Sequence, residues 1–117
     1  MLYRIDLVAD TVRNCVIGDA VRALEYKQAE LDAKEFKQNW YSGTVPKSIQ
    51  SWIEASGKTK KEATDDILYE AEVFNTILLA IREYRLKGKA EVRNAETDED
   101  AEVAFNDCTT KIKNLLV

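Results

Sequence analysis

The stretch KTKKEATDDILYEAEVFNTILLAIREYRLKGKAEVRNA, residues 58–95, carries the longest unbroken helical pattern in the chain. Its apolar side chains recur at steps of 4, 3, 4 and 3, namely Ile67, Ala71, Phe74, Leu78 and Ile81, with Leu68, Ile77, Ala80 and Tyr84 on the flanks. We expect this helix to pack on more than one neighbour, with Phe74 and Ile81 almost fully buried. Thr59, followed three residues later by Glu62, has the spacing of a capping box and predicts the start of the helix.

The length and composition of the chain favour one helical domain over residues 1–117. The chain is 45% apolar and 32% charged, which is enough to bury a core at this length. Its net charge of −4 and its pI near 4.9 disfavour a protein that binds nucleic acid by neutralising phosphates. Histidine is absent, so the commonest general base and the commonest metal ligand are both missing. We expect no enzymatic activity, no cofactor and no metal.

The cysteines and the apolar runs predict where the protein is made. Cys15 and Cys108 lie far apart without a C-x-x-C spacing, so we expect buried, reduced thiols. No run approaches the roughly 18–20 apolar residues that span a bilayer, and the opening MLYRID has an acid where a signal peptide stays apolar. We expect no membrane association and synthesis in a reducing cytoplasm.

The N-terminal segment has two readings. Tyr3, Ile5 and Leu7 alternate as in a strand, whereas a helical pattern covers more residues: Leu2, Ile5, Ala9, Val12 and Val16. We predict a helix, because no partner strand is found elsewhere in the chain. Gly18-Asp19 breaks the pattern, and Asp19 is placed as the N-cap of the next helix.

The second predicted helix covers residues 20–41. Its main face is Tyr26, Ala29, Ala33, Phe36 and Trp40. Leu24 and Leu31 lie on the other side of the same cylinder, so we expect cover on two sides. Ser42-Gly43 ends this helix, and Pro46 is expected as the first residue of a short helix that Gly57 closes in a left-handed conformation.

The long helix of residues 58–95 is followed by a last predicted helix. Gly88 costs about 1 kcal/mol relative to alanine but need not stop the helix, which we extend to Asn94 or Ala95. Thr97 is the expected N-cap of the last helix, with Asp98, Glu99 and Asp100 in its first turn. The predicted fold is all-α, an antiparallel helical bundle of four main helices plus one short helix, with more than about two thirds of residues helical and no sheet. The 3–4 rhythm also resembles a coiled-coil seam, and self-association stays open.

Two groups of side chains are candidates for contact with a partner protein. The first is an aromatic corner, Trp40, Tyr41 and Trp52, near Gly43 and Pro46. It is either an interface anchor, with at least one ring exposed, or a plug that fixes the helices. The second is the basic end of the long helix, Arg82, Arg85, Lys87, Lys89 and Arg93. These residues contact a partner or phosphate or, as we favour, pair with the acids that follow them, Glu96, Asp98, Glu99, Asp100 and Glu102. Glu62, Asp66 and Glu70 form an acidic row that we interpret as a solvated face and not a cation site.

The corner also carries a family resemblance. The motif Trp40-Tyr41-Ser42-Gly43-x-Val45-Pro46-x-Ser48-Ile49-x-Ser51-Trp52 is followed by Ala63-Thr64-Asp65-Asp66-Ile67. Ala33-Lys34-Glu35-Phe36 precedes it, and Ile81-Arg82-x-x-Arg85-Leu86-Lys87-Gly88-Lys89-Ala90 comes after. Together these segments resemble a family of small helical phage and prophage proteins associated with tails or tail fibres, from about Val12 to Leu116.

The resemblance implies a non-enzymatic phage tail protein, structural or accessory, that contacts a tail-fibre or baseplate protein. It brings no catalytic residue, cofactor or ligand site to this chain. One alternative is a tail-fibre assembly chaperone that is absent from the mature virion. A small prophage regulatory or nucleic-acid-binding protein is the third reading, which the acidic balance disfavours.

Overall fold

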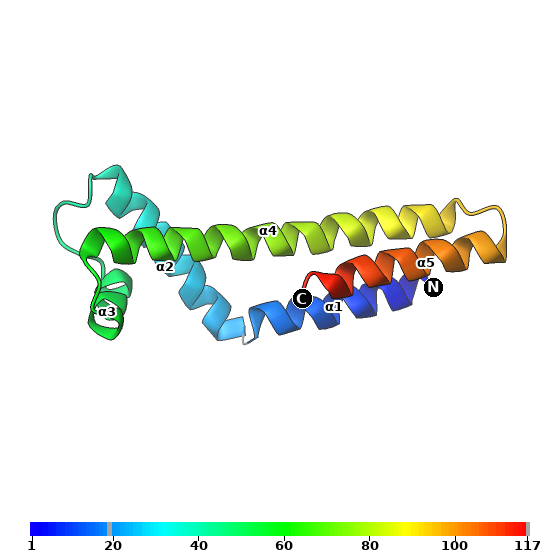
Figure 1. Ribbon diagram of the computed structural model, residues 1–117, viewed down its shortest axis with the longest axis horizontal. Helices are drawn as coiled ribbons and strands as arrows, with labels where there is room; N and C mark the ends of the chain where they lie inside the picture. The colour runs from blue at the N-terminus through cyan, green and yellow to red at the C-terminus, as the bar shows by residue number, and fades with distance from the viewer. Residues whose placement is uncertain (19, 117) are drawn as a thin grey trace. The chain divides into compact units, whose positions relative to one another are not determined.

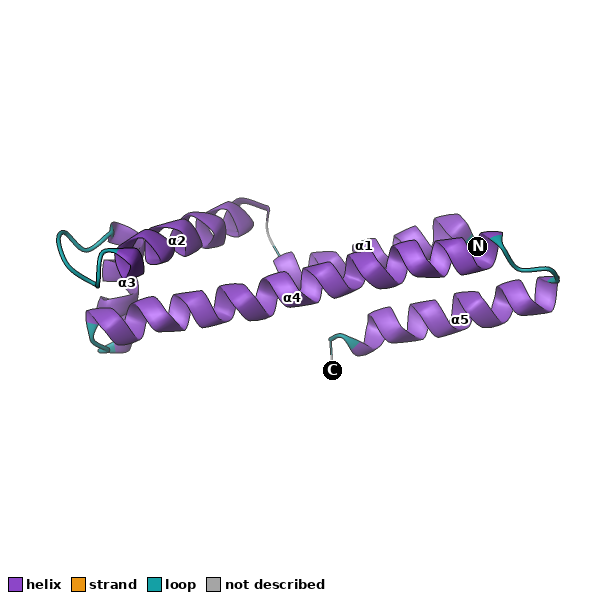
Figure 2. Ribbon diagram, turned by 90° about the horizontal axis from the view of Figure 1, so that it is seen from above, coloured by secondary structure: helices purple, strands orange, loops and turns teal. Residues whose placement is uncertain are grey.

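The structure, a computed structural model, describes residues 1–18 and 20–116. It contains α1 (Leu2–Ile17), α2 (Ala20–Gln38), α3 (Lys47–Ser56), α4 (Lys60–Arg93) and α5 (Asp98–Asn114) (Figure 1). These helices account for 83% of the described residues, none of which lies in a strand (Figure 2). The all-α prediction is confirmed, including the helix at residues 2–17. The predicted N-cap Asp19 lies outside the described residues.

The helices belong to two compact units. Unit 1 combines Met1–Gly18 with Asn75–Val117, and unit 2 is Asp19–Phe74. Helix α4 therefore contributes its first half to unit 2 and its second half to unit 1. One antiparallel bundle of all four main helices, and a single domain over residues 1–117, stay predictions.

Unit 1 packs α1, the second half of α4 and α5 around one core. α1 and α5 run in the same direction and α4 runs in the opposite one (Figures 1 and 2). The core is buried to 8% exposure or less and consists of Ile5, Ala9 and Val12 of α1, Ile81 of α4, and Phe105, Cys108 and Ile112 of α5. The helical stripe of α1 thus faces this core, while Tyr3, which suggested a strand, is 72% exposed.

Gly88 lies where α4 and α5 approach each other closely. A Cβ atom on Gly88 would lie 2.1 Å from Cys108 Sγ and 2.6 Å from Cys108 Cβ. The thiol donates a hydrogen bond to the carbonyl of Tyr84 at 3.2 Å, and burial raises its pKa. Gly88 is therefore needed for helix packing, and α4 continues through it as predicted. Cys15 is exposed, so the expectation of two buried thiols is wrong for that residue.

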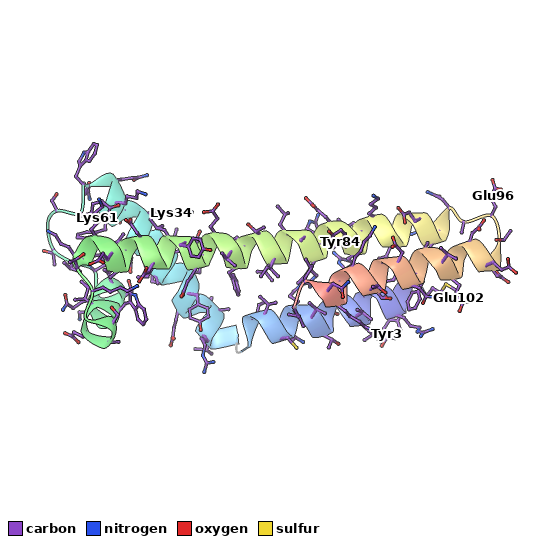
Figure 3. All side chains as sticks on the ribbon, viewed as in Figure 1. Tyr3, Lys34, Lys61, Tyr84, Glu96 and Glu102 are labelled. Carbon is purple, nitrogen blue, oxygen red and sulfur yellow. The ribbon has the colours of Figure 1, made fainter. Side chains whose placement is uncertain are left out.

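An ion cluster joins α1 to α4. Asp6 Oδ1 accepts from Arg85 Nη1 at 3.2 Å, and Asp6 Oδ2 accepts from Lys89 Nζ at 2.9 Å. The basic end of α4 was predicted to pair with the acids of residues 96–102, and within the described ranges no ion pair joins the two. Those acids lie on the connection and at the start of α5, where Thr97 caps the helix and Glu96 points away from it (Figure 3). Asp6, from the neighbouring helix, takes their place.

Replacing Asp6 with asparagine is expected to lower the free energy of unfolding by about 1 kcal/mol at pH 7. The hydrogen bond from Lys89 lowers the pKa of Asp6 despite partial desolvation, with Arg85 adding to the effect. A carboxyl group whose pKa is lower in the folded than in the unfolded protein stabilises the fold at pH values above its unfolded pKa, about 3.9. This contribution is lost as the pH falls through the folded pKa. The effect stays small because the carboxylate is 35% exposed and screened by water.

Urea unfolding at pH 7 and pH 3 checks this result. The difference between Asp6→Asn and wild type should shrink from pH 7 to pH 3, because the stability that comes from the lowered folded pKa is lost as the pH falls below the unfolded pKa of about 3.9. An equal loss at both pH values would assign the effect to packing and not to charge.

Unit 2 is built from α2, α3 and the first half of α4. Its core is Ala33 and Phe36 of α2, Ile49 of α3 and Ala63 of α4. The capping box at the start of α4 is confirmed, since the Glu62 N–H donates to Thr59 Oγ1 and the Thr59 N–H donates to Glu62 Oε1, both at 3.2 Å. These bonds fix the direction in which α4 leaves the α3–α4 connection.

Phe74 and Ile81 differ in burial although they share one predicted stripe. Ile81 is fully buried, as expected. Phe74 is only partly buried and meets Tyr26 edge to face, with ring centroids 6.3 Å apart. The prediction for Phe74 is wrong because this residue is the last of unit 2 and belongs to neither core cluster.

Candidate functional site

The aromatic corner begins where α2 ends. The N–H of Tyr41 donates to the carbonyl of Phe36 at 2.9 Å, and the N–H of Trp40 donates to the carbonyl of Lys37 at 3.0 Å. This pair of bonds is a Schellman motif, which satisfies the last carbonyls of a helix and reverses the chain. The predicted end of α2 at Tyr41 is therefore wrong, because the helix stops at Gln38.

Trp40 occupies the position of the motif that glycine normally fills. Its φ is +59° and that of Tyr41 is +57°, so two large residues adopt the left-handed conformation in succession. This conformation costs an L-residue roughly 1–2 kcal/mol, which is why glycine is preferred there. The side chain of Trp40 is nevertheless 87% exposed and recovers little of that cost by packing. A strained backbone thus holds a large apolar side chain in solvent.

Tyr41 fastens the corner to the rest of unit 2. Its ring meets Phe36 edge to face at 6.1 Å, the apolar contact that usually accompanies a Schellman motif. Its hydroxyl donates to Asp65 Oδ1 of α4 at 2.7 Å, and this bond raises the pKa of Tyr41. Lys61 Nζ lies 5.9 Å from the ring centroid. Tyr41 is therefore structural and is not available for docking.

Trp52 is held in a similar way. Its Nε1 donates to Asp66 Oδ2 at 3.1 Å, and Lys58 pairs with the same carboxylate. The hydrogen bond from Lys58, with that from Trp52 second, lowers the pKa of Asp66. The ring keeps 39% exposure. Of the three corner aromatics, Tyr41 and Trp52 bind α4, and Trp40 is the most exposed. At least one ring is thus exposed, as the interface-anchor interpretation expects.

The turns on either side of α3 agree with the sequence in part. Gly57 closes the helix at φ +73° and ψ +11°, the left-handed conformation that was predicted. Pro46 was expected as the first helical residue and is instead the N-cap, with φ −56° and ψ +145°. Proline fits both positions because its φ is nearly the same in each, and only ψ distinguishes them.

Two members of the acidic row on α4 are engaged within the protein, and the third, Glu70, is exposed as the solvated-face interpretation expected. Glu62 belongs to the capping box, and Asp66 binds Lys58 and Trp52. Among residues 1–18 and 20–116, no group of three or more histidine, cysteine, aspartate or glutamate side chains is arranged to hold a metal ion. Glu62 and Asp66 contribute to the structure of the corner.

The basic end of α4 does not form one surface. Arg85 and Lys89 bind Asp6, whereas Arg82, Lys87 and Arg93 are exposed. Arg82 and Lys87 are five residues apart, which places them about 140° apart around the helix. The five predicted residues therefore split between a structural cluster and scattered charges, and they belong to unit 1 while the corner belongs to unit 2.

Four exposed lysines at helix ends of unit 2 were not predicted as part of the site. Lys37 belongs to the last turn of α2, Lys47 begins α3, and Lys60 and Lys61 begin α4; all four are exposed. Figure 3 shows Lys61 and Lys34 toward the same end of unit 2. Of the nearby acids, Asp66 pairs with Lys58, whereas Asp65 and Glu62 accept hydrogen bonds from neutral donors and keep their charge, so this end of unit 2 presents both signs of charge. The repeated lysines of KTKK, residues 58–61, were the available signal.

Among the residues that the structure describes, no helix is both long and apolar enough to cross a membrane. A comparison of the chain with protein families, with curated proteins and with solved structures finds no match.

Proposed function

We propose that this chain is a non-enzymatic docking protein that inserts Trp40 into an apolar pocket of a partner protein. The observation that carries the proposal is the 87% exposure of a tryptophan held outward by a hydrogen-bonded, left-handed turn. The resemblance of the corner to tail-associated phage proteins suggests that the partner is a tail-fibre or baseplate protein.

The energetics of the corner suit an interface anchor. A tryptophan that buries about 150–250 Å² on docking contributes about 4–6 kcal/mol by area. Tryptophan is also among the residues enriched at interface hot spots. Because the Schellman bonds and Tyr41 already order this turn, docking loses little conformational entropy.

The charges at the corner specify the partner further. Lys37, Lys47, Lys60 and Lys61 are exposed at the ends of α2, α3 and α4, in the unit that carries Trp40, and none makes an ion pair within the described part of the chain. Carboxylates around the partner's pocket would complement them and accelerate association, with a dependence on salt. The expected receptor is an apolar pocket with an acidic rim.

Co-purification with the tail-fibre and baseplate proteins of the same phage tests the function. Trp40→Ala is expected to weaken binding about a hundredfold with the helical content unchanged, because the side chain is exposed. Tyr69→Ala, another exposed aromatic of unit 2 at 68%, is the matched control and should bind as wild type does. Equal binding by the Trp40 variant would refute docking through this residue.

Mass spectrometry of purified particles then separates two versions of the function. Presence in stoichiometric amounts supports a structural or accessory tail protein. Absence from particles, together with binding to the free fibre, supports the assembly chaperone.

A further inference from the structure

Helix α2 has a second apolar face that its own unit leaves in solvent. Val21, Leu24 and Leu31 are 66%, 71% and 49% exposed. They lie on the side of the helix opposite the buried Ala33 and Phe36. The sequence predicted cover on both sides of this helix, and unit 2 provides it on one side only.

The residue types on this face follow the heptad pattern of a coiled coil of two parallel helices. Val21, Leu24, Gln28 and Leu31 are spaced by 3, 4 and 3 residues, which assigns them to positions a, d, a and d. In a parallel coiled coil, a β-branched residue at a with leucine at d favours two helices over three or four. A single polar residue at a, here Gln28, fixes the register of such a pair at some cost in stability.

The flanking charges select the same arrangement. In a pair of parallel helices, Lys27 at position g faces Asp32 at position e of the second copy. The two-fold symmetry of the pair provides this attraction twice. In a pair of antiparallel helices, Lys27 would instead face Lys34 of the second copy, and Glu25 would face Asp32. Both contacts would be repulsive.

The existing contacts of these residues permit the new pairing. Within one copy Lys27 lies 3.6 Å from Glu30, a loose contact with a 61% exposed lysine side chain. Asp32 accepts from Gln28 at 2.9 Å and from Ser48 at 2.8 Å, one bond on each oxygen. A carboxylate has room for a further donor.

We propose that two copies of this chain associate in parallel through the α2 face formed by Val21, Leu24, Gln28 and Leu31. The contact covers only about two heptads, so the dimer is weak, with a Kd of about 10–100 µM. Parallel pairing also brings the two Trp40 side chains to the same end of the helix pair. The proposal does not depend on what Trp40 binds.

Sedimentation equilibrium of the full chain, from about 1 to 300 µM, tests the dimer. The weight-average mass is expected to rise from 13.3 kDa toward twice that value. Leu24→Glu, and independently Leu31→Glu, should weaken association about a hundredfold, because each dimer loses two buried leucines. Leu79→Glu, a 56% exposed leucine of α4, is the matched control and should leave association unchanged. Circular dichroism verifies that each variant is folded.

Two further variants test the orientation. Lys27→Glu should weaken the dimer severalfold, with the difference reduced by salt, whereas Lys34→Glu should not, because its parallel counterpart is the uncharged Asn39. Val21→Cys in a Cys15→Ser background should form a disulfide between copies, since parallel strands place residue 21 opposite itself. A mass of 13.3 kDa at every concentration would overturn the proposal, as would a dimer unaffected by Leu24→Glu or one that fails to cross-link through residue 21.

Discussion

Gly88→Ala is expected to lower the free energy of unfolding by about 3 kcal/mol, although alanine is the better helix former by about 1 kcal/mol. The added Cβ would overlap Cys108 Sγ at 2.1 Å and Cys108 Cβ at 2.6 Å, so α4 and α5 must separate and open the core around Ile81 and Ile112. Urea unfolding measures the loss.

A double-mutant cycle assigns the effect of Gly88→Ala to that contact. Cys108→Gly removes both clashing atoms, so Gly88→Ala should be less costly in its presence, and the two changes should be less than additive. Lys87→Ala, at the exposed position next to Gly88, is the control and should change the free energy by less than about 0.5 kcal/mol. If Gly88→Ala lowers the free energy of unfolding by no more than Lys87→Ala does, α4 and α5 do not touch at Gly88.

Ile81→Ala is expected to lower the free energy of unfolding by about 3–4 kcal/mol, because a fully buried side chain leaves a cavity lined by α1 and α5. Phe74→Ala should cost less than about 2 kcal/mol, below the roughly 3–5 kcal/mol of a buried phenylalanine, since Phe74 is already partly solvated. Parallel urea titrations rank the two variants. A larger loss for Phe74→Ala would show that its ring is covered in solution.

The sequence predicts the features that local interactions decide. The stripe containing Ile5, Ala9 and Val12 identifies α1 as a helix. A threonine that accepts a hydrogen bond from the N–H three residues later identifies the start of α4 and of α5. Residues distant in sequence decide the rest. Phe74 and Ile81 occupy the same stripe, and only the neighbouring helices determine which one is buried.

The sequence predicted which aromatic residues form the candidate site but not which of them is exposed. The grouping of Trp40, Tyr41 and Trp52 followed from the short connection between helices. Which ring projects depends on Asp65 and Asp66, which lie on α4 and bind the other two. The left-handed turn at Trp40 could not be predicted, because glycine is the usual signal for it and Gly43 comes three residues later. Asp6 likewise gave no local sign that it binds Arg85 and Lys89.

The central claim, that the corner keeps a strained tryptophan because it docks, is tested most directly by Trp40→Gly. Glycine adopts φ +59° without steric cost, so the free energy of unfolding should rise by about 1 kcal/mol. Binding to the proposed tail-fibre or baseplate partner is expected to fall about a hundredfold. The measurement is urea unfolding and partner affinity on one protein preparation. A variant that is more stable and also binds normally would contradict the account, and so would one that loses binding only because it unfolds.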